Sequence, residues 1–265
     1  MKELKDLREF LEVLKNIGEL QEIDVEVDWN LEIGAIIRRA YDLRAPAPLF
    51  NNIKDTENGF RVLGGSAGLS SKSGLKLARI ATSLGFPPET KANEIVSAIA
   101  DAISKKGIPP KVVDSGACHE NIVIGDDVDL YRFPTPYIHD GDGGRYINTW
   151  GTVIVQTPDK SWTNYSINRI MLLDKNRMTG LIPHQQHLGI IHKMWSDRGE
   201  PTPFALALGA PPAVPFFSGM PIPENMSEVV ALRQLYGDGV ASGSCEPVEC
   251  RVSADDERGS EGTLA

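Results

Sequence analysis

Apolar positions in the first hundred residues recur at the spacing of amphipathic helices, with short extended runs between them. The spacing predicts a helix over 4–17 and an alternating strand at 23–27. Asn30 is placed to cap a second helix, whose buried face includes Ile33 and Tyr41. Further runs predict strands at 48–50 and 60–63, helices at 75–84 and 92–105, and a Gly/Ser loop at 64–73. Alternating helices and strands are typical of an α/β domain, which we place at residues 1–115.

Helical periodicity fades after about residue 118, and short apolar runs separated by turns replace it. These runs predict strands at 122–124, 146–156, 164–173, 180–182 and 204–208, with helices at 187–195 and 227–236. Pro211 and Pro212 predict irregular backbone before the last helix. The second part of the chain is therefore expected to be an antiparallel β domain over residues 116–265.

The composition is that of a globular protein, with 41% hydrophobic and 24% charged residues. A net charge of −9 argues against nucleic acid as a partner, because phosphate binding depends on clustered lysine and arginine. The apolar runs are too short to span a bilayer and the N-terminus lacks a signal-peptide core, so we expect no membrane partner. The cysteines, Cys118, Cys245 and Cys250, are too few for a disulfide framework, which favours a cytoplasmic location.

Polar side chains suited to ligand binding gather in the stretch 162–195. Asn164, Ser166 and Arg169 can bind a phosphate or a carboxylate. His187 can ligate a metal or transfer a proton. Because the surrounding positions are apolar, we expect this stretch to build a cofactor site.

One combination of these residues suggests a metal site. Asn164, His187 and Glu228 would supply oxygen and nitrogen ligands, which suit Mn²⁺ or Mg²⁺ better than structural zinc. The three positions are far apart in sequence. From spacing alone, the more ordinary interpretation is a capping asparagine, a surface histidine and an exposed glutamate.

Two other patterns suggest ligand sites with less support. His184, His187 and His192 lie within nine residues and invite a zinc hypothesis, but no cysteine or further histidine follows at ligand spacing. The run 64–68 (G-G-S-A-G) resembles a phosphate-binding loop, yet its glycines are not at P-loop or dinucleotide-fold spacing. A plain turn is the better interpretation of that run.

Several motifs identify a family resemblance that covers nearly the whole chain. They are A-P-L-F-N-N-I at 47–53, D-G-G-R-Y-I at 142–147, the run 156–169 ending in W-T-N-Y-S-I-N-R, T-G-L-I-P at 179–183, Q-H at 186–187, 203–213 and 218–224. On these motifs the chain resembles the UbiD family of decarboxylases, in particular its ferulate and cinnamate decarboxylase branch. That resemblance implies an α/β N-terminal domain followed by a split β-barrel flavin-binding domain.

The resemblance also implies a cofactor and its ligands. The family uses prenylated FMN with Mn²⁺ (or Mg²⁺), and K⁺ is a further candidate ion. Its metal ligands fall on Asn164, His187 and Glu228, which overturns the ordinary interpretation above, and Arg169 falls on its catalytic arginine. The flavin-contacting positions are Asn164, Tyr165, Ser166, Ile167, Asn168, Arg169, Gln186 and His187. The implied reaction is reversible, non-oxidative decarboxylation of an aromatic or α,β-unsaturated carboxylic acid, by a homo-oligomer or with a complementing chain.

The end of the chain departs from the family pattern. Arg258, Gly259 and Ser260 replace apolar strand residues, so we expect a frayed strand there. The family's catalytic acids and C-terminal domain lie beyond Ala265, so we expect weak or absent flavin binding and no sustained turnover from this chain alone. The alternatives are a truncated or split non-catalytic chain that a second polypeptide completes, and a flavin reductase, which the metal ligands disfavour.

Overall fold

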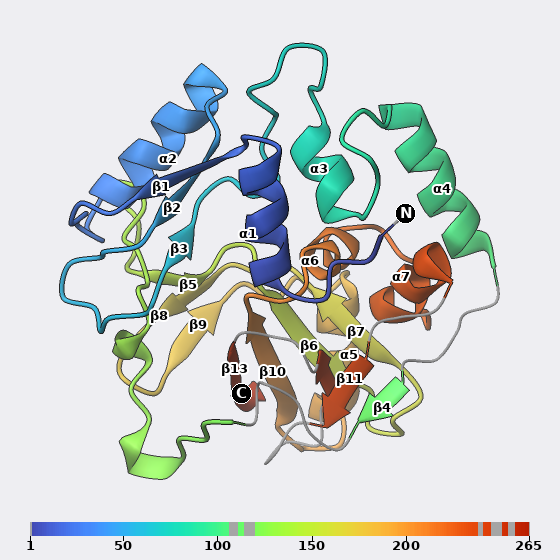
Figure 1. Ribbon diagram of the computed structural model, residues 1–265. Coiled ribbons are helices and arrows are strands. Elements are labelled where there is room, and N and C mark those ends of the chain that lie inside the picture. Colours follow the sequence, from blue (N-terminus) through green and yellow to red (C-terminus); the bar gives the residue numbers. More distant parts are fainter. Residues whose placement is uncertain are drawn as a thin grey trace.

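The computed structural model describes residues 2–105, 111–113, 120–237, 241–244, 251–253 and 258–264. The predictions for the cysteines and for a domain boundary near residue 115 fall outside these residues. The helices are α1 (Leu7–Asn16), α2 (Glu32–Leu43), α3 (Ala78–Ser83), α4 (Ala92–Ser104), α5 (His187–Ser196), α6 (Ala213–Ser218) and α7 (Glu228–Tyr236), with 3₁₀ turns η2 (Gly125–Asp127) and η3 (Leu130–Arg132). Figure 1 shows their arrangement.

The strands form short sheets of mixed topology. They are β1 (Leu20–Ile23), β2 (Ala47–Phe50), β3 (Val62–Leu63), β4 (Lys111–Val113), β5 (Tyr146–Asn148), β6 (Thr152–Gln156), β7 (Thr163–Ser166), β8 (Ile170–Leu172), β9 (Met178–Gly180), β10 (Thr202–Leu208), β11 (Ala241–Ser244), β12 (Arg251–Ser253) and β13 (Arg258–Leu264). The sheet orders are β1-β2-β3, β13-β10-β6-β7, β12-β11-β4 and β5-β8-β9. The predicted sequence of an α/β part followed by a strand-rich part is confirmed. No helix of the described ranges combines the length and apolar character needed to cross a membrane.

The first helix forms as its apolar spacing predicts. Asp6 caps it, because its carboxylate accepts the Glu9 N–H at 2.7 Å. Phe10 and Leu14 are buried in a cluster with Ala47 of β2. This packing joins α1 to the β1-β2-β3 sheet.

The predicted start of the second helix was wrong. Asn30 does not cap α2, which instead follows Leu31, a residue with a positive φ of 68° and no side-chain cap. The Leu31 N–H donates to the Tyr137 carbonyl at 2.8 Å, which ties this turn to the strand-rich part. Tyr41 is 50% exposed rather than buried. A Cβ on Gly65 would lie 3.4 Å from its ring, so Tyr41 borders the Gly/Ser loop instead of the core.

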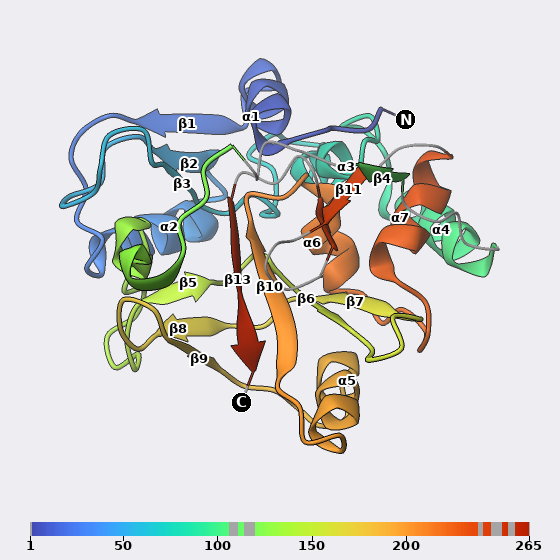
Figure 2. The ribbon, with the colours of Figure 1, turned by 90° about the horizontal axis from the view of Figure 1, so that it is seen from below.

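The sheet β13-β10-β6-β7 buries both of its faces. Ile154 and Ala205 belong to a cluster with residues of α3, α4, α6 and α7. Val153 and Leu206, one position away on the same strands, pack in a second cluster with α5. Figure 2 shows α6 and α5 on opposite sides of this sheet. The first cluster joins helices of the N-terminal part to the strand-rich part.

Several predictions for the strand-rich part need correction. Residues 122–124 form no strand and are exposed, because an apolar run alone cannot show whether a partner strand is near. The runs 146–156 and 164–173 are each divided into two strands by irregular residues. The expected fraying at 258–260 is also wrong, since β13 pairs with β10 along its whole length. Backbone pairing with a long neighbour overrides weak intrinsic propensity.

The helix α6 was missed in the sequence. Pro211 and Pro212 suggested irregular backbone, yet Pro212 forms the N-cap of this helix. Pro215 falls in the first turn, where a helix has no intrahelical partner for its N–H groups. Proline is therefore compatible with this position.

Candidate metal and cofactor site

Asn164 lies on β7, the outer strand of the central sheet, and is buried (2% exposed). Its Nδ2 donates to Glu228 Oε1 at 2.8 Å. Its Oδ1 is also buried but has no hydrogen-bond partner among the described residues. A buried carbonyl oxygen without a partner is costly, so this atom is suited to a ligand that offers positive charge.

Glu228 reaches Asn164 from the first residue of α7 and is 3% exposed. Its Oε2 accepts the Tyr165 N–H at 2.7 Å, which satisfies a donor on the open edge of β7. Burial raises the pKa of the Glu228 carboxyl to about 7, and the hydrogen bonds from Tyr165 and Asn164 oppose that rise. The carboxylate thus has neutral donors around it and an environment that would favour a cation.

His187 is the first residue of α5 and completes the cluster. Its Nδ1 lies 4.0 Å from Glu228 Oε1. Its ring meets the Trp162 ring edge-on, with centroids 4.8 Å apart. The Trp162 Nε1–H donates to the Met226 carbonyl at 3.2 Å, just before α7. Trp162 therefore connects both helix starts. Sequence reasoning did not select it, although its spacing of two from Asn164 places both on one face of an extended chain.

The N-termini of two helices meet at this cluster. α5 starts at His187 and α7 starts at Glu228. Helix N-termini carry partial positive charge and free N–H groups, which favour phosphate. Gly189 lets the backbone at Pro183 pack closely against the first turn of α5, because a Cβ at this position would lie 2.2 Å from the Pro183 carbonyl oxygen. The arrangement can hold a divalent cation beside an anionic group.

The ordinary interpretation of these residues does not hold. Asn164 is buried within a strand and does not cap a helix, and Glu228 is buried and not exposed. The zinc hypothesis finds no support either, since no group of three His, Cys, Asp or Glu side chains in the described part of the chain could hold a metal. The Nδ1 atom of His192 lies 2.8 Å from Thr202 Oγ1. Any cation at the cluster would depend on the Asn164 amide oxygen.

The other predicted flavin-contacting residues lie on neighbouring segments. Ser166 ends β7, and its hydroxyl donates to Asn168 Oδ1 at 2.8 Å. Ile167 is half-buried, and Gln186 is the exposed N-cap residue of α5. Arg169 is exposed, and its side chain forms no hydrogen bond or ion pair with the described residues. These segments flank the cluster formed by Asn164, Tyr165, His187 and Glu228.

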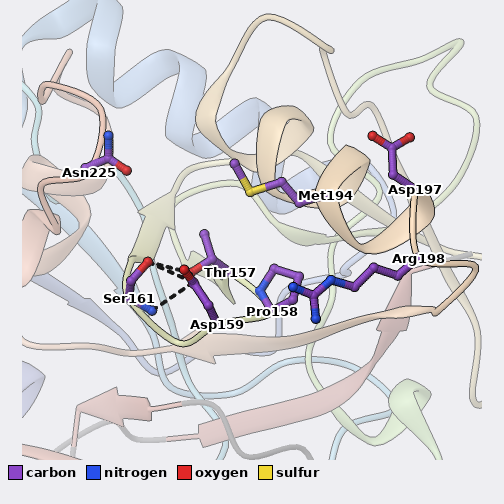
Figure 3. Close-up of a pocket in the computed structure, with 8 residues that line it drawn as sticks. All are labelled: Thr157, Pro158, Asp159, Ser161, Met194, Asp197, Arg198 and Asn225. Atoms are coloured by element: carbon purple, nitrogen blue, oxygen red, sulfur yellow. Dashed lines mark hydrogen bonds between the residues drawn. The ribbon is translucent and has the colours of Figure 1, made fainter.

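A surface pocket of about 450 Å³ lies beside the β6–β7 turn and includes none of the predicted site residues (Figure 3). Its lining residues are Thr157, Pro158, Asp159, Ser161, Met194, Asp197, Arg198 and Asn225. The hydroxyls of Thr157 and Ser161 donate to Asp159 and lower its pKa to about 2. Asp197 pairs with Lys193 at 2.7 Å. The acids of this pocket are therefore already occupied by groups of the chain itself.

Relatives of known activity are similar along most of the chain. Pyrrole-2-carboxylic acid decarboxylase of Pseudomonas aeruginosa is 46% identical over 235 residues, which cover 89% of this chain and 47% of the relative. Ferulic acid decarboxylase 1 of Saccharomyces cerevisiae is 42% identical over 265 residues, which cover 98% of this chain and 53% of the relative. The chain thus spans about half the length of these relatives.

Solved structures share the fold. Vanillic acid decarboxylase of Sedimentibacter hydroxybenzoicus in its closed form matches with a TM-score of 0.89 at 27% identity, over 99% of this chain and 55% of that one. HmfF of Pelotomaculum thermopropionicum, a UbiD-class enzyme solved in complex with FMN, matches with a TM-score of 0.85 at 28% identity, over 97% of this chain and 54% of that one. The expected mixed α/β fold is therefore confirmed.

Two family models account for most of the sequence. The N-terminal domain of 3-octaprenyl-4-hydroxybenzoate carboxy-lyase, UbiD_N, matches residues 11–99. The Rift-related domain of the same carboxy-lyase, UbiD, matches residues 111–265. The second match covers more than half of the chain and contains the whole Asn164 cluster. The chain belongs to the UbiD family.

Proposed function

We propose that this chain provides the cation- and flavin-binding part of a reversible, non-oxidative decarboxylase of aromatic or α,β-unsaturated carboxylic acids. The observation that carries the proposal is the buried Asn164 Oδ1, which lacks a partner while its amide nitrogen binds Glu228. The names of two relatives, which are decarboxylases of ferulic acid and pyrrole-2-carboxylic acid, support the substrate class.

The donor set fits a hard divalent cation. Asn164 offers an amide oxygen, Glu228 a carboxylate oxygen and His187 an imidazole nitrogen, which suit Mn²⁺ or Mg²⁺. A cation here would offset the buried Glu228 charge and satisfy the Asn164 oxygen. It would also attract a flavin phosphate to the N-termini of α5 and α7. K⁺ is a second candidate ion.

Prenylated FMN, when bound, supplies the centre that accepts the electrons released as CO₂ leaves. The family ligand positions, from Asn164 to Arg169 with Gln186 and His187, would hold it. HmfF, a structural relative, was solved with FMN, which supports this assignment. The proposed task of the chain's own residues is to bind and orient the reactants.

Arg169 is proposed to bind the substrate carboxylate. Its side chain is exposed and has no partner among the described residues, so its guanidinium is available. A planar guanidinium forms two parallel hydrogen bonds with a carboxylate, whereas lysine presents a single ammonium group. This difference predicts that charge alone cannot replace Arg169.

Assembly and location are part of the same proposal. We infer a homo-oligomer or a complementing chain, and the evolved dimeric form solved for HmfF, 26% identical to this chain, supports an assembly. A cytoplasmic location rests on the few cysteines of the sequence. Native mass spectrometry of the purified protein would show bound flavin and any second chain.

The test measures CO₂ release from cinnamate by the protein loaded with prenylated FMN and Mn²⁺, with any chain that co-purifies. Arg169→Lys should keep the melting temperature and lower kcat/KM by roughly a hundredfold. Arg198→Lys, at another exposed arginine, is the matched control and should leave both unchanged. Equal kcat/KM in the unmodified and Arg169→Lys proteins would remove Arg169 from the site. Absence of cinnamate turnover from a loaded assembly that includes a complementing chain would count against the proposed reaction.

A further inference from the structure

The segment that carries Arg169 lies in a gap between strands. β7 ends at Ser166 and β8 begins at Ile170, so residues 167–169 lack regular strand pairing. Asn168 in the middle of the gap is only 8% exposed, whereas Arg169 is exposed. The buried peptide groups of this segment therefore need hydrogen bonds from elsewhere.

Asn148, at the end of β5, meets this need. It is fully buried, and its Nδ2 donates to the Asn168 carbonyl oxygen at 2.8 Å. That carbonyl belongs to the peptide bond that leads into Arg169. Asn148 is also the register partner of Ile170, after an irregularity in the β5–β8 pairing. The side chain thus extends the pairing of β5 to Asn168, two residues before the start of β8.

The other end of the same amide is fixed as well. Asn148 Oδ1 accepts the Gly151 N–H at 2.6 Å. Position 151 requires glycine, because a Cβ on Gly151 would lie 2.6 Å from Asn148 Oδ1 and 2.7 Å from the Ala207 carbonyl oxygen. With both ends bonded in a buried site, the Asn148 amide has one orientation.

Asn168 extends this network to the flavin-contacting segment. Its Oδ1 accepts the Ser166 hydroxyl at 2.8 Å, and its Nδ2 donates to the Leu181 carbonyl at 3.4 Å. The segment 166–169 is consequently held by contacts from β5, from β7 and from the residue after β9. Arg169 is the exposed side chain at the end of this held segment.

We propose that Asn148 is a positioning residue, which fixes the backbone of residues 168–169 and so directs Arg169 toward a carboxylate. The importance for catalysis rests on the proposed function, but the positioning itself does not. Asn148 acts through the backbone and touches no reactant. Its loss should loosen the Arg169 segment before it affects the fold.

The test compares Asn148→Ala with Thr152→Val. Thr152 is a matched control, because it is a fully buried polar residue nearby whose hydroxyl lies 3.3 Å from Ser218 Oγ and not at the Arg169 segment. Amide ¹⁵N relaxation of the ligand-free protein should give order parameters of roughly 0.85 at Asn168 and Arg169, and below roughly 0.6 in Asn148→Ala. Thr152→Val should keep the rigid values. Unchanged order in Asn148→Ala, or the same loss in Thr152→Val, would overturn the proposal.

The unmodified protein supplies a second measurement if Asn148→Ala does not fold. The Nδ2 hydrogens of Asn148 should exchange with solvent as slowly as the backbone amides of β6. Fast exchange of these hydrogens would contradict the bond to Asn168 and with it the proposal.

The affinity for cinnamate then shows whether the position of Arg169 matters for substrate binding. Titration followed at the Arg169 amide should show binding roughly ten- to a hundredfold weaker in Asn148→Ala than in the unmodified protein. Equal affinity in both would show that the rigid segment does not direct Arg169. If the unmodified protein does not bind cinnamate, the proposed function fails, while the relaxation data still decide the positioning.

Discussion

Two buried glutamates have opposite surroundings in this molecule. Glu19, before β1, is fully buried, and its Oε2 lies 3.2 Å from Arg79 Nε. The hydroxyls of Ser70 and Ser71 donate to its Oε1 at 2.8 and 2.7 Å. This carboxylate has a cation and several donors, so it needs no ligand and holds the Gly/Ser loop against α3.

Glu228 is almost as buried, but no lysine or arginine of the described residues pairs with it. It accepts hydrogen bonds from the Asn164 amide and the Tyr165 backbone N–H, which are neutral, and His187 Nδ1 is 4.0 Å away. Asn164 Oδ1, which has no hydrogen-bond partner among the described residues, lies in the same cluster. The comparison distinguishes two kinds of buried carboxylate. The Glu19–Arg79 ion pair stabilises the fold, whereas Glu228 has no cation among the described residues and would be neutralised by a bound one.

The largest loss of stability should come from removing the cation of the Glu19–Arg79 ion pair. Arg79→Met leaves Glu19 buried without a cation, and the free energy of unfolding should fall by about 3–5 kcal/mol. Urea denaturation measures this loss. Arg38→Met is the control, because Arg38 pairs with Asp42 on the surface and should cost less than about 1 kcal/mol. Similar losses in both variants would mean that burial does not separate the two kinds of pair.

A smaller change in stability is expected when Glu228 is replaced. In metal-free protein, Glu228→Gln replaces a buried carboxyl whose ionised form lacks a cation, and it keeps an acceptor for the Tyr165 N–H. The free energy of unfolding should therefore change by about 1 kcal/mol or less, in either direction. A loss of several kcal/mol by urea denaturation would show that Glu228 is a structural anchor like Glu19.

Much of the fold could be predicted from local patterns. The spacing of apolar residues predicted α1, α4, α5 and α7 within a few residues, because each helix buries one continuous face. Long-range pairing was harder to predict. Residues 122–124, expected to form a strand, pair with no strand among the described residues, whereas the weak sequence of β13 forms a strand because β10 lies beside it.

The site shows the same division. Asn164, His187 and Glu228 were identified through motifs, while their spacing alone favoured unrelated roles. The structure brings them together because β7, α5 and α7 converge there, and a single sequence contains no direct record of that convergence. Trp162 and Asn148 were missed for a related reason, since their roles depend on contacts with residues 20 or more positions away.

A Mn²⁺ titration followed by electron paramagnetic resonance, with millimolar FMN present, tests the central claim most directly. The unmodified 265-residue chain should bind one Mn²⁺, because the three proposed ligands, Asn164, His187 and Glu228, already lie close together. Glu228→Gln should weaken that binding by more than roughly a hundredfold, while Glu224→Gln, an exposed acid nearby, should leave it unchanged. Mn²⁺ binding that is absent from the unmodified chain, or equally strong in Glu228→Gln, would contradict the account of an open cluster that a cation completes.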